Sequence, residues 1–200
     1  LGELGGDEVY PDLIALAAQP LHRDVRIALL RSLWDHLEHP ETWQLFGRAA
    51  SDPDWVVASR LADVPVGRLT PAQEEQLIAL LAKILERPEP DARTALLARA
   101  AYLPLSDARR HWFRALVARL ESAASDDEAR SAAGAAMVRM RPEEVGALVA
   151  AMRAVRPRRQ RFLALLASFQ PGPYAPNHQH ALASGVFELL RDDPVLVADR

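Results

Sequence analysis

Apolar side chains recur along this chain at intervals of three or four residues. Two of the clearest groups are Leu77, Leu80, Leu81, Ile84 and Leu85, and Val145, Leu148, Val149 and Met152. This spacing places the apolar side chains on one face of an α-helix. No Val-, Ile- and Thr-rich stretch alternates apolar and polar residues, so no β-strand is predicted. The predicted helices cover residues 7–19, 22–37, 41–50, 53–64, 71–87, 90–103, 106–124, 126–140, 142–155, 158–169 and 178–191.

Helix-start residues and prolines separate these segments. Thr70-Pro71-Ala72-Gln73 has the order of an N-cap, a first-turn proline and a capping-box glutamine. Asp52-Pro53 repeats the order of a cap followed by a proline. The connections between helices are then about two to eight residues long. Connections of that length predict consecutive helices that lie antiparallel and side by side.

Two sequence markers repeat with a common period. When four predicted helical segments are aligned, a small residue stands at the same position in each and forms a small-residue column. These residues lie 31, 36 and 37 residues apart; they are Ala28, Ser59, Ala95 and Ala132. Prolines before alternate helices recur with spacings of 31, 33, 38 and 34 residues; they are Pro40, Pro71, Pro104, Pro142 and Pro176. A period in the thirties that contains two helices indicates stacked helical hairpins, which bury their apolar faces only against neighbouring hairpins. We expect the small residue to allow close helix approach between successive units.

The repeated segments resemble HEAT repeats, as found in bacterial α-solenoids. Asp24-Val25-Arg26-Ile27-Ala28-Leu29-Leu30 is similar to the second-helix signature of that family, and Pro11 resembles its first-helix proline. The resemblance departs at Val57, where an arginine is expected, and fades after Arg156. It implies an all-α fold, a right-handed α-α superhelix (α-solenoid) of about five stacked helical hairpins. The opening Leu1–Gly6 resembles the end of a preceding unit, so we expect the chain to be part of a longer protein. The units of this single domain, residues 1–200, are predicted at about 1–37, 40–67, 70–104, 106–140 and 142–170, followed by a C-terminal helix at 178–191.

Several kinds of catalytic chemistry lack their residues in this sequence. The 200 residues contain no cysteine, no Gly-x-Ser-x-Gly turn and no glycine-rich phosphate loop with its lysine. The histidine groups are His36 and His39, with Glu38 and Glu41 nearby, and His178 with His180. Neither group forms His-Glu-x-x-His or offers an identifiable third ligand. We interpret His36 and His39 as side chains that satisfy the last carbonyls of a helix. The sequence therefore predicts no enzyme activity, cofactor or metal ion for this segment.

Charge is distributed unevenly along the chain. Residues 1–144 carry 17 basic and 23 acidic side chains, whereas residues 145–200 carry 7 and 4. No Asp or Glu occurs from Val145 to Phe187, a stretch that contains Arg153, Arg156, Arg158, Arg159 and Arg161. Such a cluster is able to hold phosphate, nucleic acid or an acidic protein surface, or to be a solvated connection. The net charge of −3 for the whole chain argues against nucleic acid as the partner.

The resemblance favours a non-enzymatic module for protein–protein interaction or scaffolding, which presents the concave face of its second helices. Candidate binding residues on that face are Arg31, Asp35, Arg60, Asp63, Arg99 and Arg139. Their mixed signs fit a protein partner, or adjacent domains of the same chain, better than a polyanion. The alternatives are HEAT-like enzymes, namely a DNA-glycosylase-like domain that binds nucleic acid or a bilin-lyase-like protein.

The sequence also predicts where the protein is located. No leader is visible and no apolar run reaches the roughly 18–20 residues of a membrane span, so a cytoplasmic protein without membrane contact is expected. The tryptophans, Trp34, Trp43, Trp55 and Trp112, are interpreted mainly as core residues. Trp43 and Trp55 lie near helix starts, and we expect them to be partly exposed.

Overall fold

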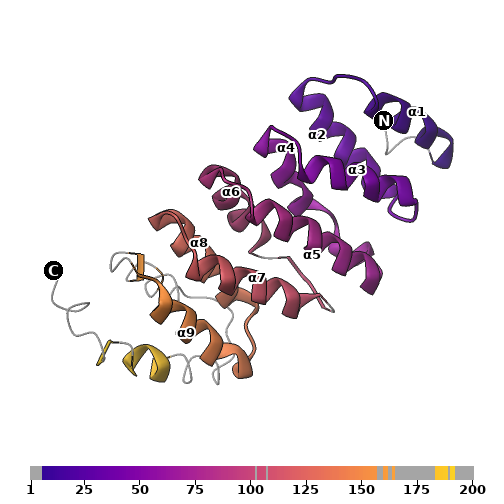
Figure 1. Ribbon diagram of the computed structural model, residues 1–200. Coiled ribbons are helices and arrows are strands. Elements are labelled where there is room, and N and C mark those ends of the chain that lie inside the picture. Colours follow the sequence, from indigo (N-terminus) through magenta and orange to yellow (C-terminus); the bar gives the residue numbers. More distant parts are fainter. Residues whose placement is uncertain are drawn as a thin grey trace. The chain divides into compact units, whose positions relative to one another are not determined.

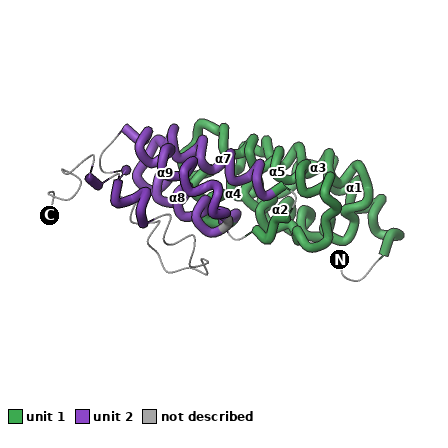
Figure 2. Tube along the Cα trace, turned by 90° about the horizontal axis from the view of Figure 1, so that it is seen from below, with its two compact units in different colours: residues 1–99, 103–108 green, residues 100–102, 109–200 purple. Residues whose placement is uncertain are grey.

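All regular elements in the part of the chain that the structure describes are helices. The computed structural model describes residues 6–101, 103–106, 108–156, 160–161, 164, 183–188 and 190–191, and no strand occurs among them (Figure 1). The fold therefore agrees with the predicted all-α class. The chain divides into two compact units, one of residues 1–99 and 103–108 and one of residues 100–102 and 109–200 (Figure 2). The prediction that residues 1–200 form one continuous domain stays a prediction.

The first unit is built from α-helices and short 3₁₀ helices. Its elements are η1 (Asp7–Val9), α1 (Tyr10–Ala17), α2 (Arg23–Ser32), η2 (Leu33–Asp35), α3 (Pro40–Ala50), α4 (Trp55–Ser59), η3 (Arg60–Asp63), η4 (Val66–Arg68), α5 (Pro71–Leu85) and α6 (Pro90–Ala100, whose last residue belongs to the second unit).

Helices of the first unit lie in two rows. α1, α3 and α5 form one row, and α2 and α4 form the other, which α6 continues (Figure 1). α1 packs on α2 and α3 packs on α4, whereas α2 also packs on α4 and α3 on α5. α2 and α4 thus pack within one row and α3 and α5 within the other, while α1 with α2 and α3 with α4 pack across the rows. Fully buried side chains of the first unit include Leu33, Phe46, Leu61, Leu77 and Leu81, each at most 1% exposed.

The second unit contains α7 (Arg109–Glu121), α8 (Asp126–Arg139), η5 (Pro142–Glu144) and α9 (Val145–Ala154). α7 packs against both α8 and α9, and α8 also contacts α9. Trp112 and Leu116 of α7 are 1% exposed. Ala132 and Ala136 of α8 are 0% exposed, so their small side chains allow close approach of the neighbouring helices.

Helix starts follow the predicted capping chemistry in one case and not in another. The capping box at Thr70 is confirmed, because Thr70 Oγ1 accepts from Gln73 N and Gln73 Oε1 accepts from Thr70 N. The predicted cap at Asp52 is wrong, because Asp54 caps α4 and Asp52 serves other donors.

Helix ends were predicted too long. The predicted helices 22–37 and 53–64 are wrong at their ends, where the chain tightens into η2 and η3. Of the predicted helix 178–191, residues 183–188 and 190–191 are described and are helical, as predicted. Of the predicted helix 158–169, only residues 160–161 and 164 are described, and these are helical. The other residues of both predictions lie outside the described part.

The predicted apolar face of the second helix is wrong at its start. Val25 is 41% exposed and Ala28 is exposed, whereas Leu29, Leu30 and Leu33 are buried. The small residues of the predicted column are accordingly not buried at every position. Ser59 and Ala132 are buried, but Ala28 is not, so the expected close approach does not hold there. Among the described residues, no helix is long and apolar enough to cross a lipid bilayer.

Candidate functional site

Side-chain polar contacts within each unit join residues about one repeat apart. Gln73 Nε2 donates to the carbonyl of Leu37, 36 residues away, at 2.7 Å. The buried Glu74 carboxylate accepts from the backbone N–H and hydroxyl of Ser106, 32 residues away. Arg109 and Glu144, 35 residues apart, form an ion pair. These separations match the sequence period and tie successive hairpins together.

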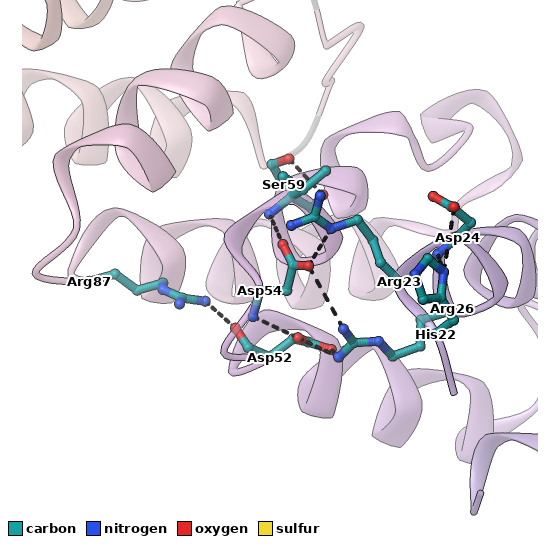
Figure 3. A network of polar contacts seen from close by, with 9 residues as sticks. His22, Arg23, Asp24, Arg26, Asp52, Asp54, Ser59 and Arg87 are labelled. Atoms are coloured by element: carbon teal, nitrogen blue, oxygen red, sulfur yellow. Dashed lines mark hydrogen bonds and ion pairs between the residues drawn. The ribbon is translucent and has the colours of Figure 1, made fainter. Parts of the chain in front are cut away.

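The loop between α3 and α4 contains Asp52 and Asp54, and several of these polar contacts converge on it (Figure 3). Asp52 accepts from Arg26 Nη1 at 2.7 and 2.5 Å, and the carbonyl of Asp52 accepts from Arg87 Nη1 at 2.6 Å. Asp54 accepts from Arg23 and, through Oδ1, from the backbone N–H of Val56 at 3.0 Å. Arginines from α2 and from the segment just after α5 therefore converge on one short loop.

The electrostatics of this loop favour the charged forms of its side chains. The hydrogen bond from Arg23 lowers the pKa of the Asp54 carboxyl from its ordinary value, and the N–H of Val56 adds to this effect. The same contact raises the pKa of Arg23. These contacts pair α2 with the loop that leads into α4, so this network connects hairpins.

The charged side chains predicted for the partner-binding face are largely paired with one another. Asp63 lies 3.3 Å from Arg60 and 3.0 Å from Arg99, which comes from α6. Asp35 pairs at 2.5 Å with Arg68 of η4, a residue that the sequence analysis missed. Both side chains of that pair stay well exposed, at 41% and 60%.

Arg31 is paired with an aromatic ring rather than with a carboxylate. Its guanidinium carbon lies 5.6 Å from the ring centroid of Trp34, close enough for a cation–π contact. Arg31 is exposed and Trp34 is half-buried. The end of α2 and the following η2 therefore present an arginine–tryptophan pair beside the Asp35–Arg68 ion pair. We call these four residues the α2-end surface.

The remaining candidates fall into two groups. The side chain of Arg139 and the residues Arg158 and Arg159 lie outside the described part. Arg153 and Arg156 are exposed, but Arg161 donates through Nε and Nη2 to its own chain, at the carbonyl of Val155. At least one arginine of the basic cluster is thus directed to the backbone.

The tryptophans differ from expectation at one position. The prediction that Trp43 is partly exposed is wrong, because it is 6% exposed and its Nε1 donates to the carbonyl of Leu37 at 2.9 Å. Trp112 is a core residue, as predicted. Trp55 is half-buried, as its place near a helix start predicted.

One group of potential metal ligands occurs among the described residues, formed by Asp7, His36, Glu38 and His39. His36 is 2% exposed, and neither of its ring nitrogens has a hydrogen-bond partner. The interpretation that its side chain satisfies helix-terminal carbonyls is therefore wrong.

Comparison with protein-family models, curated proteins and solved structures found no match to this chain.

Proposed function

We propose that this chain is a HEAT-like α-solenoid module whose function is to bind another protein without catalysing a reaction. Two observations support the solenoid. In the first unit α2 packs on α4 and α3 on α5, which is the neighbour pattern of stacked hairpins. Polar contacts between elements also span 31 to 36 residues, as the contacts between Arg23 and Asp54 and between Arg99 and Asp63 do. That span equals one unit of the sequence repeat.

The α2-end surface carries the proposal of a protein partner. Tryptophan and arginine are the residue types that most often dominate binding energy in protein interfaces. Here Trp34 is half-buried, so its ring is held in place before a partner arrives, and Arg31 stacks on it. The flanking Asp35–Arg68 pair supplies the polar edge that surrounds such anchors.

Charge pairing among the predicted partner-binding residues and Arg68 favours a protein partner over a polyanion. Arg60, Arg68 and Arg99 each lie within ion-pair distance of a carboxylate of the same unit. Binding of nucleic acid depends on arginines and lysines that neutralise phosphates and release counterions. Arginines already neutralised by Asp35 and Asp63 contribute little to such binding.

Site-specific photo-crosslinking in the native host tests the proposal. A photoreactive phenylalanine analogue at Trp34 should give a defined adduct with another protein. The same analogue at Arg48, an exposed residue of α3 in the other row, is the matched control and should give none. Arg31→Glu should lower the yield of the adduct, because it removes the stacked cation. Identical adducts from both positions, or none from Trp34, would contradict the proposal.

A second measurement separates protein from nucleic acid. Filter binding with duplex DNA at low salt should show no micromolar affinity. Micromolar affinity that falls steeply as the salt concentration rises would contradict the proposal and indicate that the partner is nucleic acid.

A further inference from the structure

Four side chains with the chemistry of zinc ligands lie together at the N-terminal end of the first unit. Asp7 belongs to η1, His36 follows η2, and Glu38 and His39 lie in the loop that leads into α3. One donor atom from each residue lies within 4.8 Å of the others. Asp7 Oδ1 is 3.9 Å from His36 Nδ1 and 4.0 Å from His39 Nε2, and Glu38 Oε1 is 3.3 Å from His39 Nε2.

These separations are close to those of a tetrahedral zinc site. Ligand atoms at about 2.0–2.1 Å from zinc lie roughly 3.3 Å from one another. The pair of Glu38 and His39 already has that separation, and the two contacts of Asp7 are longer by under 1 Å. Asp7 and Glu38 are 85% and 63% exposed, so their carboxylates are free to adjust.

His36 provides the second, independent observation. Its side chain is 2% exposed, and both Nδ1 and Nε2 lack a hydrogen-bond partner. Buried side-chain nitrogens of this kind have partners in the great majority of folded proteins. Nδ1 faces the Asp7 carboxylate across a gap too long for a hydrogen bond. An ion between them would supply the missing partner of that nitrogen.

Contacts within the chain hold the two imidazoles in place without any ion. The ring of Tyr10 stacks on His39 with centroids 4.1 Å apart and lies 5.0 Å from the ring of His36. Thr42 Oγ1 donates to the carbonyl of His36 at 2.7 Å. Leu37, between the ligands, accepts at its carbonyl from Trp43 Nε1 and Gln73 Nε2. A loop anchored at successive carbonyls is preorganised to bind a ligand.

We propose that Asp7, His36, Glu38 and His39 form a zinc-binding site. Two imidazoles with two carboxylates suit a first-row transition metal such as Zn²⁺, whereas Mg²⁺ and Ca²⁺ prefer oxygen ligands alone. No metal ion is predicted from the sequence alone, because the third ligand, Asp7, lies 29 residues before His36. A bound ion would connect η1 to the loop before α3 and stabilise the first hairpin. This inference is independent of partner binding.

Titration of the untagged, chelator-treated chain with ZnCl₂ in a calorimeter tests the site. We expect one Zn²⁺ per chain with micromolar or tighter affinity, and no heat of binding with MgCl₂. Co²⁺ in place of Zn²⁺ should give the visible absorption of a tetrahedral complex. Binding weaker than millimolar, or equal binding of Mg²⁺, would overturn the proposal.

Matched variants locate the ion. His39→Gln should weaken Zn²⁺ affinity at least roughly 100-fold, the upper end of what loss of even an outer-shell partner costs. Asp7→Asn, at an exposed position that tolerates the change, should weaken it at least roughly 10-fold. His22→Gln and Asp12→Asn alter exposed residues outside the group and should leave the affinity unchanged. Binding that His39→Gln and Asp7→Asn leave unchanged would show that other histidines hold the ion, and would overturn the assignment.

Discussion

The ion pair of Arg109 and Glu144 is a buried contact whose removal should destabilise the second unit. Arg109 Nη1 and Nη2 donate to Glu144 Oε2 and Oε1 at 2.7 and 2.9 Å, and the two residues are only 7% and 8% exposed. Glu144 also accepts from the backbone N–H of Arg141 at 2.9 Å. Arg109→Met keeps the side-chain length but leaves the buried carboxylate with that one N–H. Loss of one partner of a buried pair costs about 3–5 kcal/mol, and we expect this range.

A double-mutant cycle separates the pair from its surroundings. Glu144→Met should also destabilise, whereas Arg109→Met with Glu144→Met should lie within about 1–2 kcal/mol of the native chain, since apolar residues often replace a buried pair at little cost. Urea unfolding followed by circular dichroism gives the free energies, and hydrogen exchange in α7 and α9 locates the change. Single variants that each cost under about 1 kcal/mol, or a double variant whose cost is the sum of the singles, would refute the reasoning.

The same pair predicts a dependence on pH. Burial alone would raise the pKa of the Glu144 carboxyl, but the hydrogen bonds from Arg109 and from the N–H of Arg141 outweigh burial and lower it. Because the folded-state pKa lies below the unfolded-state value of about 4.3, the stabilisation is present above that pH. It is lost as the pH falls through the folded-state pKa. The double variant should lack this component of acid destabilisation.

Three further outcomes are expected. Glu74→Ala removes the acceptor of the Ser106 N–H and hydroxyl, and should cost about 2 kcal/mol in urea unfolding; a cost near zero would show that water takes its place. Thr70→Ala breaks the capping box of α5 and should cost about 1 kcal/mol, and Thr70→Ser should recover most of that cost. Arg23 holds the pKa of Asp54 below its ordinary value, so this stabilisation is lost only as the pH falls below about 3.9 and through the folded-state pKa. Asp54→Asn should therefore flatten the acid side of the melting temperature plotted against pH, and parallel curves for the two proteins would contradict this.

Local patterns predicted the helices better than their ends. The spacing of Leu77, Leu81 and Ile84 predicted α5, and all three are 0% exposed. The cap at Thr70 was predictable because its partner is three residues away. The ends of α2 and α4 were not, because the choice between an α turn and a 3₁₀ turn there depends on packing against the next hairpin. The exposure of Val25 likewise depends on what neighbours it.

The sequence identified residues of the candidate surface, but not which of their charges pair with one another. Arg31, Asp35 and Asp63 were expected to face a partner; the structure places Arg31 in α2, and Asp35 and Asp63 in the 3₁₀ turns η2 and η3. Two of their partners inside the chain, Arg68 for Asp35 and Arg99 for Asp63, lie 33 and 36 residues away, about one repeat. A single sequence shows that opposite charges recur with one period, but not which of them meet.

The order of apolar residues, prolines and caps by itself determined that this chain forms helices in short hairpins, because those interactions act over three or four residues. Tertiary structure alone decided which charges neutralise each other, that Trp43 is buried, and that Asp7 meets His36 and His39. Those outcomes depend on the register in which one hairpin packs on the next. That register is set by the summed burial of many side chains, which no local stretch of sequence contains.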